Sequence, residues 1–436
     1  MKGATLAANA ITRVLRIHQF RWLLIGLFAS NLGAQISFVT ATTHLFTLSE
    51  SNAVVGLLGA VTLVPMLALG LVGGVFADRM GRRRIVLGGQ LIAALAAGAL
   101  ALSVWVTGGS VLEVLAFAAV WAATIALSSP ARISLIPLVV PKSELSAANS
   151  SLTLIMTLTW IVGPLTAAIL VSVAGFEAAY GADAALGVLA FLAFARLNEA
   201  ETRLSQESKA RLRDGIHLVG RTPSVLLALT LDVIAMVLCS PRVLFPAAAT
   251  AVLLGGDVTT VGLLFASLAA GATVGSVLPG RRRWSDPGSQ SRSLVAMTIT
   301  WGGAVTAFGL VLMVNPAPPA ALAAACAAMA VAGGADARAT VVRQTTIQTV
   351  MDSAHMGRIQ GLVFVIGVAG PRLGDSLMGG LAEVTSVSRA AILGGLACVL
   401  TAALASLSLR ARLRNPPDSA PNEAQMNRAG SENSAS

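Results

Sequence analysis

The sequence predicts an all-helical integral membrane protein in which twelve spans form two repeated halves of six. The first observation is composition: the 436 residues are 55% hydrophobic and only 11% charged, whereas about 25% of a soluble chain is charged. The second is that apolar runs of about 20 residues, the length that crosses a bilayer, recur along nearly the whole chain. The third is that short motifs return at a constant offset between the two halves.

Twelve apolar runs are expected to be membrane helices. The first is too long for a cleavable signal, and no small-residue cleavage site precedes a soluble domain. The runs lie at residues 22–45, 53–77, 84–106, 111–129, 148–174, 177–195, 224–249, 258–279, 294–314, 318–335, 359–383 and 388–409.

The net charge of +10 is concentrated on alternate loops, which is the positive-inside pattern of a membrane protein rather than a nucleic-acid surface. This pattern predicts a multi-pass protein of the bacterial inner membrane with both termini in the cytoplasm, surrounded by lipid and without a nucleic-acid partner. The basic loops hold Arg13, Arg16 and Arg21; Arg79, Arg82, Arg83 and Arg84; Arg132 and Lys142; the segment Arg196 to Arg221; Arg281 to Arg283; and Arg338, Arg343 and Arg358. The other loops hold Glu50, Glu113, Glu177 and Asp257, with Arg389 as their single basic residue.

Residue types that would indicate a cofactor or an enzyme are sparse. Cys239, Cys326 and Cys398 all lie in apolar runs, where packing is a better explanation than a disulfide or a metal site. No lysine ends a glycine-rich phosphate loop, and no acid–base cluster of a membrane enzyme is present. We therefore expect no cofactor, no metal and no enzymatic activity.

Three short matches relate the two halves. VGLL at Val55–Leu58 returns at Val261–Leu264 (261 − 55 = 206), Ala131-Arg132 returns as Ala337-Arg338 at the same offset, and Gly163-Pro164 returns as Gly370-Pro371 at an offset of 207. Two repeated halves are typical of transporters that bind substrate between them near the midplane. The expected organisation is a cytoplasmic N-terminus (1–21), a first half (22–195), a cytoplasmic linker with an amphipathic helix (196–222), a second half (223–413) and a disordered cytoplasmic tail (414–436).

The loop GGVFADRMGRRRIVL, residues 73–87, is the most specific motif. Gly74 allows close packing, Gly81 allows a tight turn, and Asp78 is a carboxylate able to pair with an arginine or a helix N-terminus. The pattern resembles the major facilitator superfamily. That resemblance, which extends to about Leu413, implies a conformational latch formed by Gly74, Asp78, Arg79, Gly81 and Arg82. In the second-half loop, PGRRRWSDPG, Trp284 replaces the acidic residue, so only the first latch is complete.

Other segments resemble the branch of that superfamily with enterobactin-type siderophore exporters, the transmembrane secretion effector type. They are SSPARISLIPLVVPKSELSAANS (128–150), SPRVLFPA (240–247), the stretch HMGRIQGL from His355, and GPRLGD (370–375). Macrolide and other drug exporters form neighbouring branches, and these segments separate siderophore from drug cargo only weakly.

The stretch VFVIGVAGPRLGDSLMGGL, residues 363–381, carries Arg372 and Asp375 inside an apolar run. They are neighbours on one helix face and are able to neutralise each other, so a structural ion pair is one interpretation. The other is a cavity role. Arginine suits an anionic oxygen ligand, and Asp375 is a candidate for proton coupling, although Arg372 opposes its protonation. Gly370-Pro371 favours a kink at this point.

The seventh run supplies Asp232 and Arg242, which are too far apart for direct pairing because ten residues span about 15 Å of helix. Asp232 shares a face with Met236 and Cys239, and Arg242 lies between Pro241 and Pro246, where a helix break is expected. We predict that both residues line the substrate cavity and that Asp232 is a second candidate for proton coupling.

The first half is expected to carry no acidic residue deep in a span. Asn31 and Gln35, at i and i+4, are predicted to form a polar pair that lines the cavity or bonds neighbouring helices. The superfamily resemblance implies that the first, fourth, seventh and tenth spans line the cavity. Trp121 and Trp160 suit either aromatic cargo or packing. Gly163-Pro164 resembles an antiporter signature, but Thr159 and Ala167-Ala168 replace its flanking glycines.

These features together favour a secondary active exporter that moves a siderophore or similar secondary metabolite, with proton coupling and alternating access, as a monomer. The alternative is multidrug or macrolide efflux by the same fold. The buried arginines favour anionic cargo, and the low aromatic content of 5% argues against a site for lipophilic cations.

Overall fold

The computed structural model describes residues 13–141, 144–197, 219–220, 222–250, 258–277, 287–314, 318–350 and 353–414, without the side chains of 71–80, 353–358, 408–414 and a few single positions. The regular elements are helices. They are α2 (His18–Ser49), α3 (Asn52–Met80), α4 (Arg82–Thr107), α5 (Val111–Val139), α6 (Leu145–Ala195), α8 (Pro223–Leu238), the 3-10 turn η2 (Arg242–Leu244), α9 (Phe245–Ala248), α10 (Val258–Val277), α11 (Pro287–Val314), α12 (Pro318–Val350), α13 (Ser353–Val384) and α14 (Val387–Arg414). The predicted linker helix, the tail and Trp284 lie outside the described residues.

The all-helical membrane architecture agrees with the prediction. Ten helices of the described chain are long and apolar enough to cross a membrane. The long helix α6 counts once among them, although Gly175 breaks it with φ 82° and ψ 176°, between the predicted runs 148–174 and 177–195. Helix α13, which carries Arg372 and Asp375, is not among the ten. The twelve predicted runs are consistent with this arrangement.

The outer surface of the bundle is apolar, as a protein surrounded by lipid requires. Large hydrophobic side chains face outward, including Val173 at 81% exposure and Leu112 at 76%. Such exposure over many helices would be unfavourable in water.

Two predicted helix ends are wrong. Helix α5 continues to Val139 and α12 to Val350, so Arg132, Arg338 and Arg343 are helical rather than in loops. An apolar run ends at the first charged residue, whereas a helix continues wherever its charged side chains find partners in the interior. Arg132 does so, because it bonds Ser30 and Gln90 from neighbouring helices.

The break expected in the seventh run is present. Helix α8 ends at Leu238, and a 3-10 turn begins at Arg242 after Pro241. Proline lacks the backbone N–H that would continue the helix. The break places Arg242 on an irregular turn inside the bundle.

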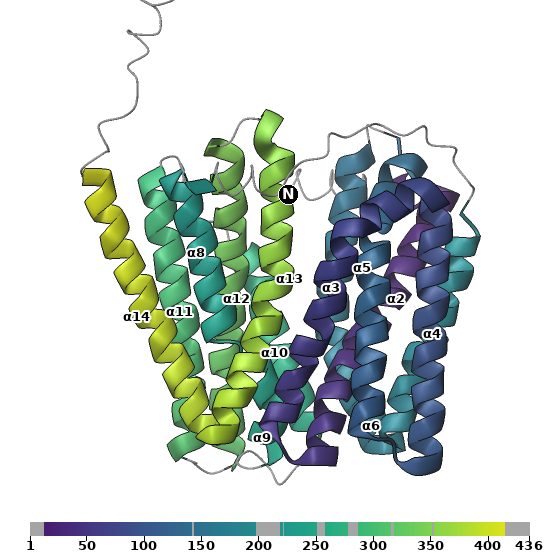
Figure 1. Cartoon of the computed structure of the whole chain (residues 1–436), viewed down its shortest axis with the longest axis horizontal. Helices are drawn as coiled ribbons and strands as arrows, with labels where there is room; N and C mark the ends of the chain where they lie inside the picture. Colours follow the sequence, from purple (N-terminus) through teal and green to yellow (C-terminus); the bar gives the residue numbers. More distant parts are fainter. Residues whose placement is uncertain are drawn as a thin grey trace, which may run out of the picture.

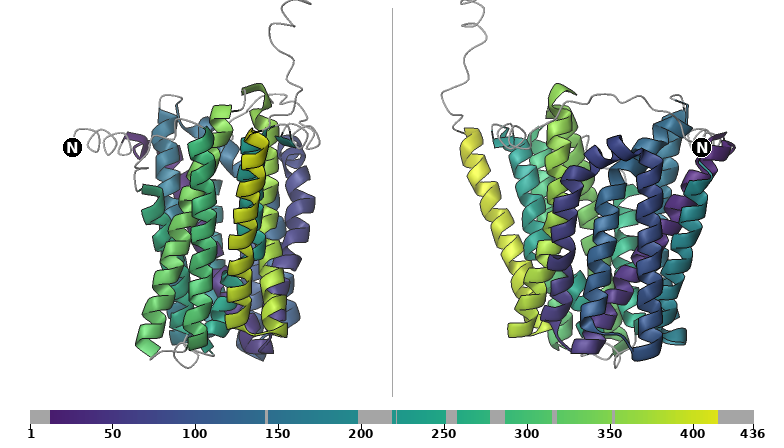
Figure 2. Two further views of the ribbon diagram at one scale, coloured as in Figure 1. Left: turned by 90° about the vertical axis from the view of Figure 1, so that its left-hand side faces the viewer. Right: turned by 45° about the vertical axis from the view of Figure 1, so that its right-hand side comes forward.

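Helices α2 to α6 lie on one side of the molecule and α8 to α14 on the other (Figure 1). Helix α2 begins and α14 ends at the same end of the bundle, which we call the terminal end. The opposite end holds the turn from α2 into α3. Figures 1 and 2 show α3 and α13 converging toward the opposite end and diverging toward the terminal end.

Small residues allow the two halves to approach closely. A Cβ on Gly56 of α3 would lie 3.1 Å from the Asp375 carbonyl oxygen and 3.2 Å from the Gly379 Cα of α13. A Cβ on Gly262 of α10 would lie 3.0 Å from the Pro164 carbonyl oxygen of α6. Gly56 and Gly262 are the glycines of the two VGLL motifs, so the internal repeat marks two equivalent junctions between the halves.

A carboxylate ties the halves together at the opposite end. Glu383 of α13 accepts hydrogen bonds from the Ser51 hydroxyl at 3.0 Å and from the Ala53 amide at 3.1 Å. Ser51 is the N-cap of α3, and Ala53 lies in its first turn, where backbone N–H groups lack helical partners. A negative charge is also favoured beside this positive end of the helix dipole.

Candidate functional site

A cavity of about 430 Å³ lies between the two halves. Its walls come from α2, α3, α5 and α6 on one side and from α8, η2, α10, α11, α12 and α13 on the other. Four of the predicted cavity or coupling residues line it: Gln35, Asp232, Arg242 and Arg372. Trp121, Trp160 and Met236 line it as well.

The second half supplies every charged side chain of the cavity lining: Asp232, Arg242, Asp336, Arg343 and Arg372. Arg343 donates a short hydrogen bond to Asp232, and both side chains are largely buried, at 12% and 6% exposure. Arg343 also donates to the Thr340 hydroxyl at 3.3 Å. Three arginines and two aspartates leave the lining with a formal charge of 3 − 2 = +1 when all are ionised.

The first half supplies an aromatic and amide wall made of Gln35, Phe38, Trp121 and Trp160. The guanidinium carbon of Arg372 lies 5.5 Å from the Phe38 ring centroid, a cation–π contact between the halves. Phe38 also meets Phe265 of α10 edge to face at 6.0 Å. Phe38 and Phe265 each lie in the half of their helix nearer the opposite end, so this contact borders the cavity on that side.

Asp375 lies behind the cavity wall instead of in it. Its side chain belongs to a residue only 6% exposed, and Oδ1 accepts a hydrogen bond from Ser240 at 2.6 Å. The salt bridges of the described residues include none between Asp375 and Arg372. The two side chains have different partners, so the predicted mutual neutralisation is not a direct ion pair.

Asn31 and Gln35 do not act as a bonded pair. The Asn31 amide donates to the Leu27 carbonyl of its own helix at 2.7 Å, and Asn31 faces a different cavity from Gln35. One helical turn is enough to separate the two residues, because α2 borders both cavities.

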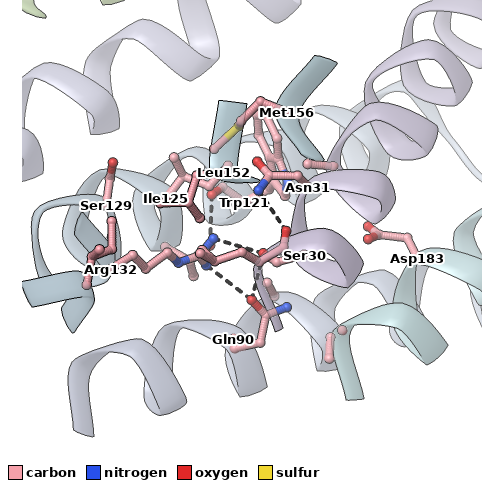
Figure 3. Close-up of a pocket in the computed structure, with 17 residues that line it drawn as sticks. Ser30, Asn31, Gln90, Trp121, Ile125, Ser129, Arg132, Leu152, Met156 and Asp183 are labelled. Carbon is pink, nitrogen blue, oxygen red and sulfur yellow. Dashed lines mark hydrogen bonds between the residues drawn. The ribbon is translucent and has the colours of Figure 1, made fainter. Parts of the chain in front are cut away.

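The second cavity, of about 220 Å³, lies within the first half (Figure 3). Ser30, Gln90, Arg132 and Asp183 line it, and it shares Ala34 and Trp121 with the central cavity. Arg132 donates to the Ser30 hydroxyl at 2.8 Å and to the Gln90 amide oxygen at 3.1 Å. A polar site inside the first half was not predicted.

Asp183 corrects the expectation that the first half has no deep acidic residue. The Ser37 hydroxyl donates to its Oδ2 at 2.5 Å, and Ser37 lies near the middle of α2. Asp336 and Arg343 were also missed as cavity residues because the predicted tenth run stopped at 335. Their signal in the sequence was the spacing of seven residues, which places both on one helix face.

The structure covers the predicted latch only in part. Gly74, Asp78 and Arg79 lie in the last ten residues of α3, outside the described side chains. Gly81 has φ +85° and forms the turn between α3 and α4, and Arg82 begins α4. The neighbouring Arg83 donates to the Ala195 carbonyl at 2.6 Å and so joins α4 to the end of α6.

The fold resembles solved transporters of the major facilitator type. A bacterial homologue of the human lysosomal transporter Spinster, in an inward-facing and occupied conformation, matches with a TM-score of 0.68 and 16% identity over 93% of this chain and 99% of its own. The nucleoside transporter NupG matches with a TM-score of 0.70 and 14% identity over 89% and 98%. A bacterial homologue of the iron transporter ferroportin, in an inward-facing state, matches with a TM-score of 0.67 and 15% identity over 91% and 99%. Two helical halves around a charged central cavity define a membrane transporter, not an enzyme.

The transmembrane secretion effector family matches residues 11–431, and the chain belongs to that family. The enterobactin exporter EntS of Citrobacter koseri is 27% identical over 414 residues, which cover 93% of this chain and 95% of the relative. The protein of the same name from Escherichia coli O1:K1 is 26% identical over 390 residues, covering 87% and 90%. The predicted resemblance is confirmed.

Proposed function

We propose that the protein exports an anionic, aromatic secondary metabolite of the siderophore class from the bacterial cytoplasm, as a monomer, with proton coupling. The observation that carries the proposal is the central cavity, in which arginines face an aromatic wall. Two relatives of the chain are named as enterobactin exporters, which supports the same class of cargo. The terminal end of the bundle is then the cytoplasmic end, in agreement with the placement of basic residues.

Catecholate cargo fits the two walls in complementary ways. The guanidinium groups of Arg242 and Arg372 are suited to phenolate or carboxylate oxygens, because arginine presents several donors in a fixed plane. Trp121 and Trp160 on the facing wall offer flat surfaces for an aromatic ring. Arg343 is engaged with Asp232, which leaves the other two arginines as the primary cargo ligands.

Alternating access then consists of the halves rocking about the cavity. The structure is closed at the opposite end by the Phe38–Phe265 contact, the junction of α3 with α13 and the Glu383 hydrogen bonds. Loss of these contacts, with closure of the terminal end around the predicted latch of Gly74, Asp78, Arg79, Gly81 and Arg82, would release cargo outside. Protons are proposed to act on Asp375, beside the α3 junction, with Asp232 as the second candidate.

Transport into everted membrane vesicles under an imposed proton gradient tests this proposal. A catecholate siderophore and a lipophilic cationic drug are offered side by side to vesicles with the wild type, Asp375→Asn or the control Glu113→Gln. Glu113 is an exposed carboxylate bonded to Ser103 within the first half. We expect gradient-dependent siderophore uptake that Asp375→Asn abolishes and the control retains.

Other outcomes of the same experiment have clear meanings. Uptake of the drug alone would overturn the siderophore proposal in favour of multidrug or macrolide efflux. Siderophore uptake that Asp375→Asn leaves unchanged would remove Asp375 from coupling, and Asp232→Asn would then be tested in the same vesicles.

A further inference from the structure

We infer that Asp183 is a proton-binding site in the first half, separate from the charged residues of the central cavity and connected to the opposite end of the bundle through Tyr180 and His44. The site adds to the proposed proton-coupled transport and rests on that proposal for its place in the transport cycle. The inference rests on the surroundings of Asp183, on the residues that face it and on the polar pairs between α2 and α6.

Among the described residues, Asp183 is a carboxylate without a charged partner that would neutralise it. It lines the cavity of the first half, and it accepts a hydrogen bond from the Ser37 hydroxyl, which carries no charge. The salt bridges of the described residues include none to Asp183. An ionised group inside a membrane costs about 2.5–3.5 kcal/mol on insertion scales, and binding a proton removes that charge.

The charged neighbour across the cavity is engaged elsewhere. Arg132 of α5 bonds Ser30 and Gln90, and its guanidinium carbon lies 5.9 Å from the Phe194 ring centroid. Figure 3 shows Arg132 directed to these partners, on the far side of Ser30 from Asp183. Helix α4 contributes the neutral Gln90 to the cavity, and among the described lining residues Arg132 is the only charged one besides Asp183.

The second carboxylate oxygen packs directly against the backbone of α2 at Gly33. Oδ2 accepts from Ser37, and a Cβ added to Gly33 would overlap Oδ1. Glycine at this position therefore allows α2 to approach α6 while keeping Oδ1 free of a side chain. Oδ1 is the atom on which we place the bound proton, and Ser37 continues to donate to Oδ2.

A second polar pair lies further along the same interface of α2 and α6. His44 is seven residues after Ser37 on α2, and Tyr180 is three residues before Asp183 on α6, so both pairs occupy one face of each helix. The His44 Nδ1 lies 3.4 Å from the Tyr180 hydroxyl. Both residues are buried, at 2% and 0% exposure, where polar groups are normally hydrogen-bonded for a structural or functional reason.

This pair lies between Asp183 and the opposite end of the bundle. A Cβ on Gly109, in the turn between α4 and α5, would lie 3.2 Å from the His44 ring. Imidazole and phenol groups both donate and accept hydrogen bonds, so each can take a proton on one side and give one up on the other. Glu177 lies one turn before Tyr180 on α6. A divalent cation would need about six or more oxygen ligands, whereas a proton needs one carboxylate oxygen.

Infrared difference spectroscopy of the purified protein without cargo tests the site directly. Between acidic and alkaline pH, the protonated carboxyl absorption of the wild type should contain a band from Asp183 that Asp183→Asn lacks, while the bands of the other carboxyl groups remain. Ser37→Ala should keep the band but shift it to higher frequency, because the carboxyl group loses a hydrogen bond. Glu113→Gln, the exposed control, should retain the wild-type band unchanged.

A band that is identical in the wild type and Asp183→Asn would overturn the inference. If Asp183→Asn does not fold, the Ser37→Ala shift decides, and an unshifted band is then the negative result. Vesicle transport adds a second readout: Asp183→Asn should lower gradient-driven uptake at least tenfold while retaining cargo exchange without a gradient. Loss of the infrared band with no siderophore transport by the wild type would retain the proton site and reject the cargo proposal.

Discussion

At the residue scale, Arg372 is a charged residue of the central cavity that also contacts an aromatic side chain of the first half. Its guanidinium lies over Phe38 of the first half and lines the cavity with Arg242. A lysine at this position would keep the charge but lose the planar set of donors. The side chain is therefore the best single probe of cargo recognition.

Replacing Arg372 with alanine should weaken cargo binding about 10- to 100-fold, because a hydrogen bond to a charged group contributes about 1.5–3 kcal/mol and 1.4 kcal/mol is about tenfold. Arg372→Lys should recover only part of the affinity. Binding of a catecholate siderophore to the purified protein, followed by tryptophan fluorescence, measures both. Arg389→Ala, at the opposite end, is the control, and an equal loss there would contradict the prediction.

The ion pair of Asp232 with Arg343 has a different consequence. Removing one partner of a buried pair leaves the other charge uncompensated, at about 3–5 kcal/mol. Asp232→Asn should therefore lower the thermal stability of the purified protein. The double variant Asp232→Asn with Arg343→Gln should recover part of the loss. A double variant no more stable than Asp232→Asn would show that the pair is not the source of the effect.

Some of these residues were predictable and others were not, for physical reasons. Gln35, Asp232, Arg242 and Arg372 stand out as polar residues in apolar runs, and packing gathers them in one cavity. Asp375 stands out equally, but whether it faces the cavity or Ser240 depends on the rotation of α13 about its axis. Hydropathy carries no information on that rotation, because neighbouring helices determine it.

At the element scale, the junction of α3 with α13 depends on residues without side chains. A Cβ on Gly59 would overlap the Arg372 carbonyl oxygen and lie 3.1 Å from the Asp375 Cβ. The helices are thus as close as their backbones permit. The same junction positions both Arg372 and Asp375, so its geometry affects the cavity directly.

Gly59→Ala should push α3 away from α13 and raise the population of molecules open at the opposite end several-fold. Reaction of a cysteine introduced at Ser51 with a membrane-impermeant thiol reagent measures this opening. Gly380→Ala, on α13 of the same helix pair, is the matched control because its Cβ would meet nothing within 4 Å. Equal reaction rates in the two variants would contradict the prediction.

The helices themselves were largely predictable, and their ends were not. Runs of apolar residues located the elements because lipid demands them over a full span. Two predicted runs stopped too early, at 129 and 335, because Arg132 and Arg343 beyond them find partners inside the bundle in Gln90 and Asp232. Asp183 was overlooked because its depth depends on the break at Gly175 and on how α2 packs against α6.

At the scale of the whole molecule, Glu383 is a connection between the halves that the sequence did not indicate. Glu383 and Ala53, whose amide it accepts a hydrogen bond from, are 330 residues apart in the sequence. Hydrogen bonding to that amide and to Ser51 favours its ionised form. Its donors belong to one half and its carboxylate to the other, so the contact exists only when the opposite end is closed.

Glu383→Ala should therefore favour the form that is open at the opposite end. Each lost hydrogen bond to a charged group contributes about 1.5–3 kcal/mol before exposure to solvent weakens it, so a shift of a few-fold is expected. Distances between spin labels on α3 and α13 measure the two populations. Glu113→Gln, whose carboxylate bonds within one half, should leave the populations unchanged, and a shift there would contradict the interpretation.

The two halves of the chain contribute different chemistry to the central cavity. Residues before the central linker supply three of the five aromatic side chains of the described lining (Phe38, Trp121 and Trp160, beside Phe265 and Trp301 of the second half), and residues after it supply all of its charges. Substitutions in one half can therefore alter the shape of accepted cargo without altering its required charge. A hybrid of this first half with the second half of another family member would therefore inherit the charge selectivity of its central cavity from the second-half parent alone.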